Sequence, residues 1–120
     1  MSDEAKKFDQ NKDPLSLIPR DALIAVSRVL AYGARKYDAH NWRKGMNWSR
    51  LIDATLRHLT AWNEGVEVDS ESGLNHLAHA MCNIAFLITY QARGLGKDDR
   101  YKEPTEVFDA LRAKYDEKDK

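Results

Sequence analysis

The sequence has few of the features that mark secreted or membrane-spanning proteins. It contains a single cysteine, Cys82, which cannot form an intramolecular disulfide and is typical of a protein in a reducing compartment. No apolar run approaches the ~18 residues that a membrane span needs. Residues 1–13 also lack the apolar core of a signal peptide. These absences predict a cytoplasmic protein with no membrane partner.

The sequence also has no excess of charge of either sign. Its 19 lysines and arginines balance its 19 aspartates and glutamates, for a formal net charge of +0. A broad basic surface is therefore not expected, which argues against polymeric nucleic acid or an anionic membrane as partner. The length of 120 residues suits one domain. We expect residues 1–13 to form a flexible segment and residues 14–118 to form a single domain.

Alternation of apolar and polar residues, the mark of half-buried strands, is missing as well. Apolar residues recur instead at helical spacing over residues 19–36, 48–63 and 73–93, and again after Pro104. Asn47 and Ser72 are candidate N-caps for the second and third helices. The pattern predicts an all-α bundle of about four helices. Such a small bundle leaves broad apolar faces, so we expect a dimer or a higher homo-oligomer.

The helical spacing also predicts which side chains are buried. On the second helix the expected buried face consists of Trp48, Leu51, Ile52, Thr55, Leu59 and Trp62. On the third helix it consists of Leu74, Leu77, Ala78, Met81, Ala85 and Ile88.

An unusual polar stripe accompanies the apolar face of the third helix. His76, His79 and Asn83 are spaced i, i+3, i+7, so they share one face, and Asp69 and Glu71 precede them. Imidazoles and carboxylates are common ligands of divalent metals. The histidines could equally be hydrogen-bonded core residues, and both interpretations remain open at this stage.

Two further polar segments suggest a ligand site. Between residues 36 and 44 the chain concentrates basic, aromatic and amide side chains, which could hold a nucleotide or could form a surface loop anchored by a tryptophan. On the second helix Arg50, Asp53 and Arg57 form a polar stripe, with His58 at its boundary. If that stripe faces a cleft, Arg57 is a candidate phosphate ligand and Asp53 a candidate metal ligand.

Five motifs carry a resemblance to a known family: LIPRDAL, YGARKYDAHNWRKG, DATLRHLTAW, DSESGLNHLAHAMCN and GLGKDDR. Together they resemble the phage-type dATP/dGTP diphosphohydrolases, part of the all-α, MazG-like group of nucleoside triphosphate pyrophosphohydrolases. The resemblance implies hydrolysis of dGTP, dATP or both between the α and β phosphates, giving the nucleoside monophosphate and pyrophosphate. It further implies a magnesium cofactor, a homo-oligomer and, for a phage-encoded protein, the host cytoplasm.

The resemblance also implies roles for individual residues. The metal ligands would be Asp53, Asp69, Glu71, His76 and His79. The catalytic residues would be Glu71, His76 and His79, with Glu71 activating water. Nucleotide or phosphate would be held by Lys36, Tyr37, Asn41, Trp42, Arg43, Lys44, Arg57, His58 and Asn83.

One departure from the family pattern bears on the metal. The MazG-like group has Glu-x-x-Asp where this chain has His76-x-x-His79. Because Mg²⁺ prefers oxygen ligands, either the metal is Mn²⁺ or Co²⁺, or the histidines contact phosphate while Asp69 and Glu71 hold Mg²⁺.

Two alternative functions remain open from the sequence. An HD-type dNTP triphosphohydrolase also uses histidine and aspartate around a metal, although this chain has no His-Asp dipeptide. A non-catalytic helical module that binds a nucleotide or a partner protein is the second alternative.

Overall fold

The described part of the chain, residues 4–118 of the computed structural model, is all-α, as predicted. It contains the helices α1 (Arg20–Lys36), α2 (Trp48–Asn63), α3 (His76–Arg93) and α4 (Thr105–Lys118), and no strand. Two short 3-10 helices, η1 (Leu15–Leu17) and η2 (Asn41–Lys44), precede α1 and α2. The bounds of α1 and α2 and the start of α4 agree with the sequence pattern. Residues 1–3 of the expected N-terminal segment lie outside the described residues.

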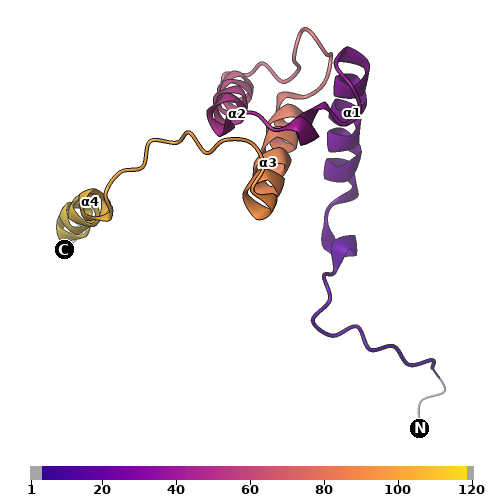
Figure 1. The fold of residues 1–120 in the computed structure, drawn as a ribbon, viewed down its shortest axis with the longest axis horizontal. Coiled ribbons are helices and arrows are strands. Elements are labelled where there is room, and N and C mark those ends of the chain that lie inside the picture. Colours follow the sequence, from indigo (N-terminus) through magenta and orange to yellow (C-terminus); the bar gives the residue numbers. More distant parts are fainter. Residues whose placement is uncertain (1–3, 119–120) are drawn as a thin grey trace.

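Helix α3 is the centre of the packed unit. Both α1 and α2 pack against it, and α4 lies apart at the end of an extended segment (Figure 1). Val29 of α1 and Ala78 and Cys82 of α3 form the centre of the core, with Ala25, Leu74 and Phe86 packed around them. Burial raises the pKa of the Cys82 thiol to about 11, so this cysteine is a packing residue.

The buried faces differ in part from those predicted. On α3, Ala78 is buried as expected, but Leu77, Met81, Ala85 and Ile88 are exposed. The other buried residues of α3 are His76, Ala80, Cys82 and Tyr90. On α2, Leu51 and Thr55 are buried as expected, but Ile52, Leu59 and Trp62 are exposed. For α3 the reason is that the helix is apolar on most sides outside the stripe of His76, His79 and Asn83, so periodicity alone does not select the packed face. The small side chains at 78, 80 and 82 allow neighbouring helices to approach closely.

The beginning of α3 also differs from the prediction. Asn75, not Ser72, is its N-cap, and the Asn75 side chain accepts a hydrogen bond from the Leu77 amide at 2.7 Å. Gly73 has φ of +72°, a left-handed conformation that turns the chain before the helix begins. Residues 69–74 therefore form a loop, and Ser72 is free to contact other groups.

Helix α2 is capped by a distant residue. Asn47 occupies the N-cap position, but its side chain makes no capping hydrogen bond. The Asp99 carboxylate instead accepts hydrogen bonds from the amide and hydroxyl of Ser49, and these bonds lower the pKa of Asp99. The Trp48 indole donates to the Leu95 carbonyl at 3.0 Å. The segment after α3 thus fixes the start of α2.

None of the helices within residues 4–118 combines the length and the apolar character that crossing a bilayer requires.

Candidate functional site

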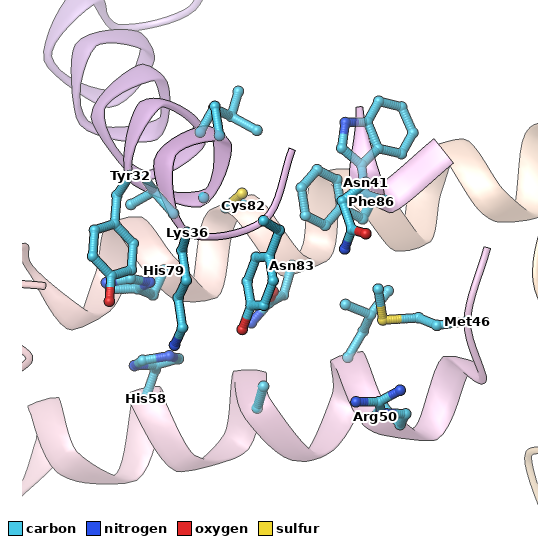
Figure 2. Close-up of a pocket in the computed structure, with 18 of the residues that line it drawn as sticks. Tyr32, Lys36, Asn41, Met46, Arg50, His58, His79, Cys82, Asn83 and Phe86 are labelled. Atoms are coloured by element: carbon cyan, nitrogen blue, oxygen red, sulfur yellow. The ribbon is translucent and has the colours of Figure 1, made fainter. Parts of the chain in front are cut away.

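A pocket of about 630 Å³ opens between α1, α2, α3 and the η2 segment. Its volume lies in the range of small-ligand sites. Figure 2 shows side chains from all four segments converging on it. The polar stripe of α2 faces this pocket, since Arg50, Asp53 and Arg57 all line it.

Three histidines gather at one end of the pocket. The Nδ1 atoms of His58 and His76 lie 2.8 Å apart, and the ring of His58 stacks on that of His79 with centroids separated by 4.6 Å. His79 Nε2 and Ser72 Oγ are hydrogen-bonded at 2.7 Å. The loop of residues 69–74 therefore anchors one imidazole, and α2 and α3 bring the other two together.

Asp69 completes a group with metal-binding potential. One ligand atom each from His58, Asp69 and His76 lies within 4.8 Å of the other two. Asp69 Oδ1 also accepts hydrogen bonds from the amides of Glu71 and Ser72, which fix the orientation of the carboxylate. Two imidazoles and one carboxylate are a donor set that suits divalent transition metals better than Mg²⁺.

The side chains at the histidine end of the pocket have protonation states that favour binding of a cation. Burial, together with the neighbouring imidazoles, lowers the pKa of His58 below its ordinary value of 6.5. Burial likewise lowers the pKa of His79. Partial burial acts to raise the pKa of Asp69, but hydrogen bonds from Ser72 and the nearby His79 outweigh it and lower that pKa. At neutral pH His58 and His79 are therefore neutral and Asp69 is ionised.

Glu71, the expected water-activating base, is bound to other side chains. Its Oε1 accepts hydrogen bonds from Tyr32 Oη at 2.9 Å and from Lys36 Nζ. The Lys36 ammonium lowers the pKa of Glu71, and the carboxylate in turn raises the pKa values of Lys36 and Tyr32. Glu71 is not part of the group formed by His58, Asp69 and His76. This arrangement holds Lys36 beside the pocket.

Most of the side chains that the sequence analysis singled out line this pocket. They are Lys36, Tyr37, Asn41, Trp42, Asp53, Arg57, His58, Asp69, Glu71, His79 and Asn83. Arg43 and Lys44 do not line it. Arg43 instead donates to His40 Nδ1 and lies over the Trp42 ring. His76 is buried and does not line the pocket, but its ring contacts that of His58, which does.

Among the pocket residues that the sequence did not indicate as ligand contacts are Tyr32, Met46, Arg50 and Phe86. Two of them carried a usable signal. Phe86 follows His79 by seven residues and therefore shares its helical face, and Arg50 precedes Arg57 by the same interval. Tyr32 and Met46 carried no comparable signal, because their contribution depends on how α1 and the loop before α2 pack.

The fold and the pocket define an all-α domain that presents imidazole, carboxylate and cationic side chains to a small-molecule site. Residues 2–100 match the family described as dATP/dGTP diphosphohydrolase, N-terminal, and the chain belongs to this family. A protein of Salmonella phage PMBT28 named dATP/dGTP diphosphohydrolase is 42% identical to it over 94 residues. That alignment covers 78% of this chain and 32% of the phage protein, so the chain spans about a third of the relative's length. None of the solved protein structures matches the chain.

Proposed function

We propose that this chain is the hydrolytic domain of a metal-dependent nucleoside triphosphate pyrophosphohydrolase that converts dGTP and dATP to the monophosphates and pyrophosphate. The observation that carries the proposal is the convergence of His58, Asp69 and His76 beside a pocket lined by the cations Lys36 and Arg57. Family membership and the name of the phage relative support purine deoxynucleotides as substrates. Hydrolysis of a triphosphate is favoured by cationic side chains that bind the phosphates and by a metal ion that neutralises their charge.

The donor set favours Mn²⁺ or Co²⁺ over the Mg²⁺ that the family resemblance implies. His58, Asp69 and His76 would hold the ion, and they provide two nitrogen ligands but only one carboxylate. A bound ion would neutralise phosphate charge and lower the pKa of a coordinated water. Asp53 and Glu71 lie on the pocket wall outside this donor group.

The other residues of the pocket bind and orient the substrate. Arg57 and Lys36 would bind the phosphates, because a guanidinium and an ammonium donate several charge-assisted hydrogen bonds. We assign proton acceptance from water to His79, whose half-buried ring lines the pocket and is held by Ser72 Oγ. Glu71 would serve to hold Lys36, since a carboxylate paired with an ammonium is a weaker proton acceptor.

Product analysis tests the reaction directly. The purified protein would be incubated with dGTP, dATP, dCTP or dTTP in the presence of Mg²⁺, Mn²⁺, Co²⁺ or EDTA, and products would be separated by ion-exchange chromatography. We expect dGMP and dAMP with an equal amount of pyrophosphate, more with Mn²⁺ or Co²⁺ than with Mg²⁺, and none with EDTA.

A matched pair of arginine variants ties this reaction to the pocket. Arg57→Ala is expected to raise KM about tenfold or more because it removes charged hydrogen bonds to phosphate. Arg43→Ala removes the same charge outside the pocket and should leave KM near the wild-type value. Release of inorganic triphosphate would instead identify HD-type chemistry. Absence of turnover with every metal would favour the non-catalytic binding module.

A second copy of the chain is the proposed partner. An exposed apolar stripe on α3, made of Leu77, Met81, Ile84 and Ile88, adjoins exposed apolar residues of α2. Ile52 of α2 lines a shallow groove together with Ile84 and Ile88. The exposed apolar residues of α2 and α3 therefore form one continuous surface. A contiguous exposed apolar surface is unfavourable in water, which supports an interaction with a second copy.

We expect light scattering to give a mass of at least twice the 13.8 kDa of one chain. Met81→Glu should shift the protein toward the monomer, because it places a charge within the apolar stripe. A wild-type protein that stays monomeric at high concentration would contradict the proposed homo-oligomer.

A further inference from the structure

The pocket has two chemically different ends. The histidine end carries His58 and His79, whereas the opposite end carries Asn41, Phe86, Met46 and Arg50 (Figure 2). The seven residues from His79 to Phe86 advance about 10 Å along α3, at 1.5 Å per residue. If the phosphates bind at the histidine end, as the proposed function requires, the base extends toward the opposite end.

Trp42 has no free ring face on which that base could stack. Phe86 stacks on the indole with centroids 5.0 Å apart and an interplanar angle of 14°. The guanidinium of Arg43 lies over the Trp42 ring at 4.4 Å from its centroid. Phe86 and Met46, both half-buried, are apolar side chains at this end that are available to contact a base.

Asn41 is the polar group best placed to read the base. Its side chain is half-buried and projects into the pocket beside Phe86 (Figure 2). Its backbone amide donates to the Asp38 carbonyl, but its carboxamide has no hydrogen-bond partner within residues 4–118. Two donor hydrogens and an acceptor oxygen are thus available to a ligand.

We propose that Asn41 reads the Watson–Crick edge of the purine base and accepts both adenine and guanine by presenting its carboxamide in two orientations. In one orientation the amide oxygen accepts from adenine N6–H and the amide nitrogen donates to adenine N1. A half-turn about the last side-chain bond exchanges the two groups. The oxygen then accepts from guanine N1–H and the nitrogen donates to guanine O6.

The length of the pocket adds selection against pyrimidines. Cytosine and thymine present similar donor and acceptor pairs, but these pairs lie closer to the sugar than in a purine. With the phosphates at the histidine end, a pyrimidine stops short of Asn41. The amide therefore allows either purine, and the distance between the two ends of the pocket disfavours the shorter bases.

The test compares Asn41→Asp with Asn41→Leu by two readouts. One is kcat/KM for dGTP and dATP, and the other is equilibrium binding of dGMP and dAMP by calorimetry, which needs no turnover. Aspartate accepts from guanine N1–H and N2–H but repels the lone pair of adenine N1. We expect Asn41→Asp to raise the preference for guanine about tenfold or more, and Asn41→Leu to weaken both purines by about 10- to 100-fold.

Asn63→Asp is the charge control, because Asn63 is exposed at the end of α2 and does not line the pocket. It should leave the preference unchanged. Arg50→Met tests the competing base reader, since an arginine donates to guanine O6 and N7 but finds no matching pair on adenine. Loss of dGTP activity alone in Arg50→Met, together with an unchanged preference in Asn41→Asp, would overturn the assignment to Asn41.

These experiments distinguish failure of the role of Asn41 from failure of the proposed reaction. A wild-type protein that hydrolyses both purines, with Asn41 variants of unaltered preference and binding, refutes the role of Asn41 and leaves the reaction intact. A wild-type protein without turnover refutes the reaction, and monophosphate binding to the variants then decides the role of Asn41. Circular dichroism of each variant verifies that the fold is retained.

Discussion

Asp69→Asn is expected to reduce metal-dependent nucleotide hydrolysis by at least about 100-fold, because even residues that only support metal ligands contribute 10- to 100-fold. Asp69 supplies the single negative charge of the group that it forms with His58 and His76 in the described part of the chain. Asparagine retains an oxygen that can accept from the amides of Glu71 and Ser72, so the loop should keep its shape. Calorimetric titration with Mn²⁺ and Co²⁺ should show a matching loss of metal affinity.

Asp53→Asn provides the control for this experiment. Asp53 also lines the pocket, and its substitution removes the same charge, but it is outside the donor group. We expect its metal affinity to stay near that of the wild type. If Asp53→Asn abolished metal binding and Asp69→Asn did not, the metal would be held by the carboxylate of α2 and the histidines would have another role.

Gly96→Ala is expected to lower the free energy of unfolding by about 2–5 kcal/mol, the sum of left-handed backbone strain and overpacking. Gly96 has φ of +70°, and a Cβ atom there would overlap the Met46 carbonyl oxygen and lie 3.2 Å from the Met46 amide nitrogen. The neighbouring backbone is held in place, since Trp48 donates from its amide to Lys97 and from its indole to Leu95. Urea denaturation followed by circular dichroism measures the effect.

Gly94→Ala is the matched variant for Gly96→Ala. Gly94 ends α3 with φ of +66°, nearly the value of Gly96, but a Cβ atom there meets nothing within 4 Å. Only the backbone strain of about 1–2 kcal/mol is therefore expected. Equal losses in the two variants would show that the contact between Gly96 and Met46 does not restrict this position.

Some groupings of residues at the site follow from spacing within one helix, and these are the ones that the sequence could predict. His76, His79 and Asn83 share a face because helical geometry alone places residues three and seven apart together. The same rule grouped Arg50, Asp53 and Arg57 on α2, and all three line the pocket. Local spacing could not indicate that His58 would meet His76, since the two are on different helices and their contact depends on how α2 packs against α3.

Sequence by itself determined the all-α class, the extents of α1 and α2, the start of α4, and the family, because helical periodicity and linear motifs are local properties of the chain. Only the tertiary structure decided which face of α3 is buried, that Glu71 pairs with Lys36, and that Arg43 and Lys44 lie outside the pocket. These outcomes depend on contacts between residues far apart in sequence. A helix that is apolar on most sides, such as α3, leaves the choice of packed face to the shapes of its neighbours.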